Sequence, residues 1–592
     1  RLVGSEMCIR DRDVYRTIMR QKLLFMQAPT GVGKTISTIF PAVKAVGEEL
    51  ADRIFYLTAK TITATVAKET FALLEKNGYR AKTIQITAKE KLCPCDEMEC
   101  NPVTCPYAKG HFDRVNDAVF DLLHRCEMIE RDDILSQADR YTVCPFELCL
   151  DTASWCDNVI CDYNYVFDPN VYLKRFFQEG IKGDYIFLID EAHNMVERSR
   201  QMYSAQIYKE DFLTVKRIMK EHSRSIEKAL EKCNKILLGM KRECENYTVY
   251  DTLGNMVFSF MRLMTLLDEF LQKANEFPGK KDVMDFYFEL RNFLNIYDLV
   301  DEHYVMYSEL EADGRFMLKL FCVDPSLNIQ KRLDKGKSAV FFSATFLPVN
   351  YYKSLLSTKK DNYAIYADST FDSKKRLLAM ATDVSTRYTR RSRSEYERIA
   401  GYINAVVTQK TGNYMVFFPS YKMMNDVADI YCEKYADETE LMLQKNNMSE
   451  AEREEFLDRF SEESDRTLVA FGIMGGIFGE GIDLKNDRLI GAIVVGTGLP
   501  QISNERTILK DYYDAENGCG FDYAFRYPGI NKVLQAAGRV IRTTEDTGVI
   551  LLLDERFWQR EYDLLYPREW SDRKPCNIAN VGKLVADFWE QI

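Results

Sequence analysis

Short apolar runs, separated by segments that favour helices, dominate the first part of the chain. Residues 23–27, 54–58 and 186–189 are such runs, and we expect each to form a buried strand. A glycine-containing loop follows the first run, and a helix is expected to start near Lys34. Because apolar strands joined by helices form a parallel sheet with both faces covered, this pattern predicts an α/β fold.

Two segments interrupt this alternation before it returns. Residues 93 to about 149 are rich in Cys, Pro and charged residues and are interpreted as an insertion. Residues 203–314 are dominated by Leu, Met, Lys and Glu with weak strand signals, which predicts a second, mostly helical insertion. A second alternating block begins around residue 375. The strands expected after the insertions are 339–342, 414–418, 467–471, 492–495 and 549–553.

Composition limits the class of protein without identifying it. The 592 residues correspond to about three to five domains. The chain contains no apolar stretch of 18 or more residues and no secretory signal pattern, so we expect a cytoplasmic protein without a membrane helix. A net charge of −11 does not indicate nucleic-acid binding, but a large acidic protein can carry a local basic track.

The first dozen residues do not fit the pattern of the rest. Residues 1–12 show no clear periodicity, and residues 4–10 resemble the translation of a sequencing adapter. We expect a leader that is not native and keep it out of the fold prediction. A genuine N-terminal arm is the alternative.

Residues 28–35 hold the core of a phosphate-binding loop between an expected strand and an expected helix. The stricter pattern begins with glycine, and Ala28 stands at that position here. Glycines let the backbone curl so that N–H groups face phosphate oxygens, and the following helix adds its positive end. The alternative is an ordinary glycine-rich turn before a helix. The predicted nucleotide ligands are Thr30, Gly31, Gly33, Lys34 and Thr35.

An acidic pair follows the apolar run 186–189, where a metal-binding carboxylate belongs in such a fold. In this arrangement Lys34 reaches the β- and γ-phosphates of ATP, and the Thr35 hydroxyl ligates Mg²⁺. Asp190 then holds the same Mg²⁺, while Glu191 polarises the attacking water as general base. An isolated acidic pair after a strand is usually a solvated strand end, but the upstream phosphate loop favours the catalytic interpretation.

Further motifs resemble those of superfamily 2 helicases and occur in the same order. Residues 58–61 resemble motif Ia, and residues 343–345 resemble motif III, which couples hydrolysis to DNA movement. Residues 479–483 resemble motif V, and residues 535–542 resemble motif VI. Each motif is weak alone, but their joint order over most of the chain is specific. The resemblance adds Asp483 of motif V to the nucleotide-binding residues.

Motif VI implies residues that act on ATP from a second lobe. By this resemblance Arg539 and Arg542 face ATP, and Gln535 helps to position the water and the γ-phosphate. Hydrolysis spreads negative charge over the γ-phosphoryl group, so arginines that reach in from another lobe make the reaction depend on closure. A surface ion pair is the alternative for two arginines on a helix.

Nine of the sixteen cysteines fall between Cys93 and Cys161. Clustered thiols in a cytoplasmic protein of this size favour a metal site over disulfides. Zinc is the main alternative, but structural zinc sites usually contain Cys-x2-Cys pairs, and this segment has none. We expect the last of the nine to be buried thiols that pack as small hydrophobic groups: Cys149, Cys156 and Cys161.

The Asp-Glu-Ala-His box with a cysteine-rich insertion before it is similar to the XPD/DinG group of iron–sulfur helicases. That group carries an iron–sulfur domain between motifs Ia and II and a helical arch between motifs II and III. The resemblance implies a 4Fe–4S cluster, which four thiolates suit. Cys95 departs from the pattern and is an alternative to the first ligand. The implied ligands are Cys93, Cys100, Cys105 and Cys144.

Two segments are candidates for nucleic-acid contact. Residues 163–165 contain two tyrosines and resemble a family segment near the DNA path; aromatic faces can stack on bases. A core position for these rings is an equal alternative. Residues 387–393 are strongly basic and could bind the phosphates along a strand without recognising its base sequence. The alternative is a solvated loop.

The predicted fold is α/β, with two RecA-like parallel-sheet lobes and two insertions in the first lobe. The resemblance implies a monomeric 5′-to-3′ DNA helicase that uses ATP and Mg²⁺, acts on single-stranded and forked DNA, and serves DNA repair or replication. The expected division is a leader at 1–12, lobe 1 at 13–89, 151–202 and 315–350, an iron–sulfur domain at 90–150, a helical arch domain at 203–314, and lobe 2 at 351–592.

Two other functions are compatible with these motifs. One is an RNA-directed or duplex-translocating ATPase, and the other is a DNA-binding scaffold that ATP switches without strand separation. Helicases of this group also have a helix and an adenine-reading glutamine before the phosphate loop. Only residues 14–18 resemble the end of that helix, so we expect an N-terminally truncated chain.

Overall fold

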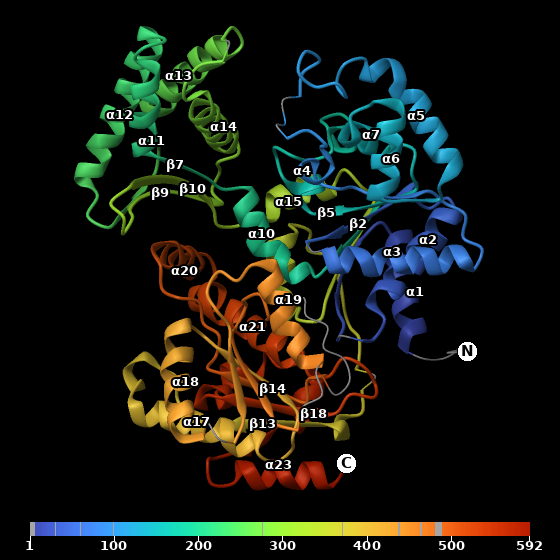
Figure 1. Cartoon of the computed structure of the whole chain (residues 1–592), viewed down its shortest axis with the longest axis vertical. Coiled ribbons are helices and arrows are strands. Elements are labelled where there is room, and N and C mark those ends of the chain that lie inside the picture. The colour runs from blue at the N-terminus through green and yellow to red at the C-terminus, as the bar shows by residue number, and fades with distance from the viewer. Residues whose placement is uncertain are drawn as a thin grey trace.

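Two parallel β-sheets, one built mainly from each half of the chain, form the two lobes of the protein (Figure 1). The computed structural model describes residues 6–29, 31–59, 61–96, 98, 100–274, 276–369, 371–435, 438–461, 465–479 and 488–592. Every apolar run predicted as a strand is a strand in the structure. The α/β prediction with two large parallel sheets is therefore confirmed.

The first sheet has eight strands, and its central strands are buried on both faces. Helices cover these faces, which explains why the strands are continuously apolar instead of alternating. In spatial order the strands are β12 (Tyr363–Tyr366), β1 (Leu23–Gln27), β11 (Ser338–Ser343), β6 (Tyr185–Asp190), β2 (Arg53–Thr58), β5 (Asn158–Asp162), β3 (Thr83–Gln85) and β4 (Met128–Ile129).

The helices of the first lobe connect these strands. They are α1 (Glu6–Met19), α2 (Lys34–Gly47), α3 (Thr61–Lys76), α8 (Asn164–Phe167), α9 (Lys174–Phe177), α10 (Met195–Met202), α15 (Ser326–Leu333) and α16 (Val349–Leu356), with a short 3₁₀ turn η1 (Ala192–Asn194) after β6.

The first lobe continues past residue 350, where we had expected the second lobe to begin. Strand β12 pairs in parallel with β1, so that residues 363–366 lie beside residues 24–27. Backbone hydrogen bonding to the open edge of β1 decides this placement. The half-buried β12 carries only a weak strand signal.

The chain start is also folded more extensively than expected. Helix α1 includes residues 6–12, which we had kept out of the fold. Arg10, Val14, Thr17 and Ile18 are all buried. Their spacing is that of one face of a helix, and α1 lies along α2.

The cysteine-rich region, residues 90–150, is a small helical unit at the edge of the first sheet. Its short strand β4 pairs with β3, which attaches the region to the sheet. Its helices are α4 (Lys89–Leu92), α5 (His111–Arg125), α6 (Arg131–Tyr141) and α7 (Pro145–Ala153).

The second insertion is mostly helical, as predicted, but it also contains an antiparallel sheet that we had not expected, and it extends past residue 314. Strand β10 extends to Cys322, and Gly314 turns the chain between β9 and β10 with φ +84°. We call residues 203–322 the arch region. Its elements are β7 (Ala205–Tyr208), α11 (Lys209–Met219), α12 (Arg224–Glu243), β8 (Tyr247–Tyr250), α13 (Asn255–Leu271), α14 (Lys280–Tyr297), β9 (Tyr304–Leu310) and β10 (Phe316–Cys322).

The second lobe is built on a seven-stranded parallel sheet. In spatial order its strands are β15 (Glu440–Leu443), β16 (Leu468–Ile473), β14 (Asn413–Phe418), β17 (Gly491–Val495), β18 (Gly548–Leu553), β13 (Arg376–Ala381) and β19 (Lys574–Cys576). Its helices are α17 (Arg393–Val407), α18 (Tyr421–Tyr435), α19 (Glu450–Asp458), α20 (Asn504–Asn517), α21 (Tyr527–Ala537), α22 (Arg560–Asp563) and α23 (Val581–Glu590).

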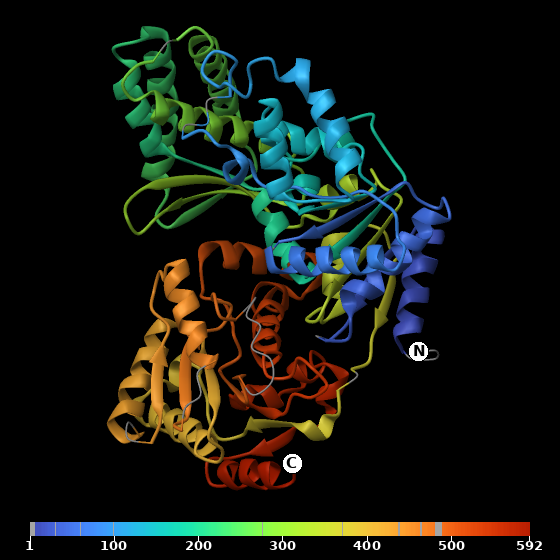
Figure 2. The same cartoon turned by 45° about the vertical axis from the view of Figure 1, so that its right-hand side comes forward.

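The cysteine-rich region lies on the side of the first lobe that faces away from the second lobe, whereas the arch region stands beside the first lobe with its sheet above α20 (Figures 1 and 2). Helix α20 of the second lobe reaches the arch region, where Glu505 forms an ion pair with Lys319 and Asn504 exchanges hydrogen bonds with Asn246. In the described part of the chain, no helix is long and apolar enough to cross a lipid bilayer.

A ring stack at the centre of the first lobe provides a test of this core. Phe25 and Phe341 are neighbours on β1 and β11, with ring centroids 4.8 Å apart. We expect Phe341→Ala to lower the free energy of unfolding by about 3–5 kcal/mol, because the cavity adds to the lost burial. Calorimetry should show a lower melting temperature. As a control, Phe112→Ala removes a ring that is 85% exposed and should change stability by less than about 0.5 kcal/mol; equal effects would contradict the core assignment.

Candidate active site

The loop between β1 and α2 has the backbone of an anion-binding turn. Gly31 and Gly33 have φ values of +80° and +75°, in the left-handed region that glycine adopts without strain. Gly33 caps the N-terminus of α2, so the helix start points its free N–H groups toward the loop. Lys34 begins the helix. Thr30, also predicted as a ligand, lies outside the described residues.

Asp190 is a buried carboxylate at the end of β6. The Tyr56 hydroxyl donates a hydrogen bond to its Oδ2 at 2.6 Å, and the backbone N–H of Glu191 donates to its Oδ1 at 2.8 Å. Burial and then the charge of Glu191 raise the pKa of Asp190, while Lys34 and Tyr56 counteract this shift. The site therefore holds a carboxylate whose charge needs positive partners.

Thr35 and Asp190 lie around the same phenol. Both the Asp190 carboxylate and the Thr35 hydroxyl affect the pKa of Tyr56, which burial raises first. The phenol thus lies close to one carboxylate and one hydroxyl oxygen. Hard oxygen donors beside a phosphate loop are the chemistry that Mg²⁺ prefers, so these residues fit a magnesium ion bound together with a nucleotide.

Glu191 stands at the centre of the site in an uncommon backbone conformation. Its φ of +47° is left-handed, which is rare for a residue with a side chain. Its Oε1 lies 3.8 Å from Lys34 Nζ, and its Oε2 lies 3.3 Å from both His193 Nδ1 and Ser343 Oγ. The turn therefore directs the carboxylate toward the phosphate loop.

His193 joins the two lobes, a role that the sequence did not reveal. Its Nδ1 lies 2.7 Å from Ser343 Oγ, and its Nε2 lies 2.6 Å from Gln535 Nε2 on α21 of the second lobe. The Gln535 amide can only donate to an unprotonated Nε2, so this arrangement puts the ring proton on Nδ1, facing Ser343 and Glu191. Gln535 thereby lies close to the site.

The two motif VI arginines have different surroundings. A Cβ atom at Gly31 would lie 2.2 Å from the carbonyl oxygen of Arg542, so the second lobe touches the phosphate loop directly. Arg539 donates a hydrogen bond to the carbonyl oxygen of Gly479 at 2.9 Å. Asp483 and the rest of the motif V segment after Gly479 lie outside the described residues.

Gln27 ties the start of the phosphate loop to residues 343–346, a connection that strand prediction alone could not give. Its amide donates to the Ala344 carbonyl and accepts from the Phe346 N–H, both at 2.7 Å. The Ala28 N–H also donates to the Ser343 carbonyl at 2.9 Å. A shift of either loop is thus transmitted to the other.

Five thiols of the cysteine-rich region share one neighbourhood. Burial and then Cys105 and Cys93 raise the pKa of Cys95 to about 11. Cys144 precedes α7, and although burial raises its pKa, the N–H groups of Glu147 and Phe146 counteract the shift. Both Cys93 and Cys95 belong to this neighbourhood, so the choice between them as ligand stays open.

Lys89 lies among the remaining thiols. Its contact with Cys100 raises its pKa, and Cys144 and Cys93 add to the effect. An ammonium group and a helix N-terminus beside several sulfurs both favour thiolates, so the donor set fits a metal–thiolate cluster. The thiols Cys149, Cys156 and Cys161 are buried, as predicted.

The two tyrosines considered for base stacking belong to the core. Tyr163 is fully buried, and its hydroxyl donates a hydrogen bond to the backbone oxygen of Asp190. Tyr165 is 8% exposed. Neither ring presents a face on which a base can stack, and Tyr163 instead supports the end of β6.

The basic segment 387–393 is largely neutralised by its own lobe. Arg390 pairs with Glu555 at 3.3 Å, and Arg393 pairs with Glu433 at 2.6 Å. These partners compete with any phosphate. The structure therefore favours the interpretation of this segment as a charged surface loop.

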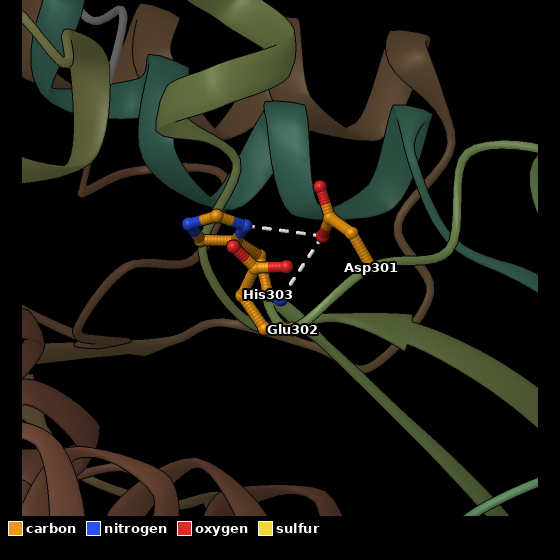
Figure 3. Close-up of side chains that lie close together, drawn as sticks. All are labelled: Asp301, Glu302 and His303. Atoms are coloured by element: carbon orange, nitrogen blue, oxygen red, sulfur yellow. Dashed lines mark hydrogen bonds and ion pairs between the residues drawn. The ribbon is translucent and has the colours of Figure 1, made fainter.

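One further cluster of potential metal ligands lies between α14 and β9. Atoms of Asp301, Glu302 and His303 approach within 4.8 Å of one another (Figure 3). Asp301 Oδ1 accepts hydrogen bonds from the backbone N–H of His303 at 2.9 Å and lies 3.0 Å from its Nδ1. An aspartate side chain that closes a turn forms such hydrogen bonds with the backbone two residues later. The local turn therefore explains why these three side chains lie together.

Comparisons with known proteins show the families and the fold that this chain resembles. Residues 74–212 match the DEAD_2 family, and residues 403–573 match the helicase C-terminal domain family. The chain is 25% identical to the ATP-dependent DNA helicase XPD of Sulfolobus acidocaldarius over 95% of this chain and 96% of that protein. It is 20% identical to the general transcription and DNA repair factor IIH helicase subunit XPD/RAD3 of Saccharomyces cerevisiae, over 93% and 86%. A solved Xpd structure from S. tokodaii has the same fold, with a TM-score of 0.61, 14% identity and coverage of 96% and 99%.

The hydrogen bond from Tyr56 to Asp190 makes a testable prediction about pH. The bond lowers the pKa of Asp190, so Tyr56→Phe should raise that pKa further and require a higher pH to ionise the carboxylate. We expect the acidic limb of the pH profile for Mg²⁺-dependent ATP hydrolysis to move to higher pH. Tyr79→Phe, which removes a phenol that bonds Asn158 instead, serves as the control. An unchanged acidic limb in Tyr56→Phe would contradict the assigned role.

Proposed function

Because the chain belongs to the XPD-like family of superfamily 2 helicases, we propose that it is an ATP-dependent DNA helicase. The proposal rests most on one contact, the 2.6 Å approach of Gln535 to His193. This contact brings motif VI of the second lobe against the Asp-Glu-Ala-His box of the first. A motor needs such a junction, because the rate of hydrolysis must depend on how the two lobes are positioned.

We propose that ATP binds with its phosphates at the loop that contains Gly31 and Gly33. Lys34 contacts the β- and γ-phosphates, and Thr35 and Asp190 hold the magnesium ion that accompanies the nucleotide. When bound, that ion neutralises charge on the phosphate oxygens. Thr30 and Asp483 complete the proposed nucleotide-binding set.

Glu191 is the proposed general base. Its carboxylate accepts a proton from water while the water oxygen bonds to the γ-phosphorus and the bond to the β-phosphate oxygen breaks. The products are ADP and inorganic phosphate. Lys34 at 3.8 Å and the Nδ1 of His193 at 3.3 Å orient this carboxylate. Through His193, Gln535 makes the position of this carboxylate depend on the position of the second lobe.

Arg539 and Arg542 are proposed to stabilise the charge that develops on the γ-phosphoryl group. The close approach of Arg542 to Gly31 supports this role for the segment. Closure of the lobes would bring the guanidinium groups onto ATP, and opening after hydrolysis would withdraw them. Repeated closure and opening move the motor along a single strand, with a 5′-to-3′ direction that comes from the family resemblance.

For the cysteine-rich region we propose a 4Fe–4S cluster held by Cys93, Cys100, Cys105 and Cys144, with Cys95 as the alternative to Cys93. The shared neighbourhood of these thiols and the Lys89 ammonium group support it. A bound cluster supplies a rigid covalent link between distant parts of this region. The region can then act as a wedge that separates the two strands of forked DNA while one strand is held as single-stranded DNA. We propose that this activity serves DNA repair or replication.

The phosphate loop gives the first test of this function. We expect Lys34→Ala to reduce DNA-stimulated ATP hydrolysis by about a hundredfold or more, because one preorganised cation at the developing charge is worth that much. Unwinding of forked DNA should be lost with it. Lys44→Ala on the same helix removes a cation that is 55% exposed, pairs with Glu48 and lies over the Tyr15 ring, and it should leave hydrolysis unchanged. Near-normal hydrolysis in Lys34→Ala would refute the site.

The cysteine cluster gives a second, independent test. Anaerobically purified protein should contain iron and sulfide, and Cys105→Ser should lower both. We expect this variant to keep much of its ATPase activity, because the lobes and the nucleotide site stay intact, and to lose unwinding of forked DNA. Cys432→Ser, at an exposed thiol of the second lobe, is the matched control. Full unwinding by protein without bound iron would overturn the wedge role.

A further inference from the structure

A groove between α12 and α13 of the arch region is lined by four cations. It encloses about 510 Å³, a volume in the range of pockets for drug-sized ligands and much larger than one phosphate group needs. Three of the cations follow one face of α12 at helical spacing, and the fourth faces them from α13. The cations are Arg224, Lys228, Lys232 and Arg262, and the other lining residues are Ser225, Ala229, Ser259 and Leu266.

These four cations have no carboxylate partner within 4.0 Å among the residues that the structure describes. The neighbouring carboxylate of Glu231 forms ion pairs with Lys216 and Lys235, which do not line the groove. All four cations are exposed to solvent. A protein with a net charge of −11 thus concentrates uncompensated positive charge in one hollow.

The end of a helix strengthens this positive field. Arg224 is the first residue of α12, a helix of 20 residues, so the partial positive charge of its N-terminus lies at one end of the groove. Ser225 adds an exposed hydroxyl group beside Arg224. From Arg224 to Lys232 the groove follows α12 for about 12 Å, the axial length of about three to four phosphates on one DNA strand.

We propose that this groove binds the phosphodiester backbone of nucleic acid. Among the described residues that line it, none is aromatic and none is acidic, so the groove can hold phosphates but offers no ring for base stacking. The same lack of an apolar aromatic anchor argues against an acidic protein segment, whose binding usually depends on such an anchor. Binding should therefore be independent of base sequence and sensitive to salt.

The position of the groove defines what it would hold. Helices α12 and α13 lie at the end of the arch region that is remote from the second lobe (Figure 1). A strand held there is outside the nucleotide crevice. The inference rests on the proposed helicase function and adds to it a second DNA contact, remote from the second lobe.

The test compares the wild-type protein with a variant that carries Lys228→Ala, Lys232→Ala and Arg262→Ala. Fluorescence anisotropy measures binding of a fork, an oligo-dT strand and a blunt duplex between 50 and 300 mM NaCl. We expect affinity for the preferred DNA to fall roughly tenfold at low salt, since each exposed charge pair contributes about 1.5- to 5-fold. The slope of log affinity against log salt should decrease by about two for a single strand or almost three for a duplex.

Four further measurements separate a local effect from a general one. Lys235→Ala, Arg242→Ala and Lys273→Ala together remove three cations of the arch region that do not line the groove, and this variant should bind DNA like the wild type. Lys228→Arg, Lys232→Arg and Arg262→Lys keep the charge and should restore binding. Circular dichroism melting checks that all three proteins fold alike, and kcat for ATP hydrolysis at saturating DNA should stay unchanged.

The outcomes distinguish this inference from the function on which it rests. If wild-type ATPase is stimulated by DNA but the groove variant keeps the wild-type affinity and salt slope, the groove does not bind DNA. If polyglutamate displaces DNA from the wild type as well as an equal charge of oligo-dT does, the groove is a site for acidic protein segments and the inference is overturned. If the wild type shows no DNA-stimulated hydrolysis, the proposed function itself fails.

Discussion

A buried carboxylate that must carry charge is the constraint on which this structure depends. Asp190 ends a strand that is covered on both faces, and burial raises its pKa. Three neighbouring groups stabilise the charged form of this carboxylate: a phenol from β2, the backbone N–H of the next residue and the ammonium group of Lys34. These partners come from three segments, and only a parallel sheet brings its strand ends to the same edge. The phosphate loop, the carboxylate pair and the sheet therefore form one unit.

The contacts between the lobes are of two kinds. An apolar contact joins Tyr351 of the first lobe to Tyr523 and Tyr527 of the second, and polar contacts lie nearer the nucleotide site. Gln535 meets His193, the backbone of Arg542 meets Gly31, and Arg506 of α20 pairs with Glu197 at 3.2 Å. Glu197 follows the Asp-Glu-Ala-His box on α10, so this ion pair connects the nucleotide site with α20. Because α20 also contacts the arch region, a movement of the second lobe can be transmitted to the arch region. Polar contacts of this kind exchange partners with water at modest cost.

The two insertions have different structures and are suited to different proposed roles. The cysteine-rich region gathers thiols beside an ammonium group and a helix N-terminus, a setting that favours a metal–thiolate cluster and hence a stiff unit. The arch region instead consists of a four-stranded antiparallel sheet and four helices, and it carries an exposed basic groove. A stiff unit can separate strands, whereas a basic groove can hold a backbone without regard to sequence.

The sequence by itself determined the eight predicted strands, the phosphate loop and the carboxylate pair. Each is a local signal: an apolar run, glycines that permit φ values near +80°, or an acidic pair directly after a strand. Other features required tertiary structure. The pairing of β12 with β1, the antiparallel arch sheet, the burial of Tyr163 and the pairing of Arg390 with Glu555 depend on partners far away in the chain. The arch hairpin is an exception, because Asp313-Gly314 is a local sequence signal for a hairpin turn. His193 and Gln535 are 342 positions apart, and no periodicity or motif can state that two such side chains meet, because only the packing of both lobes sets the distance between them.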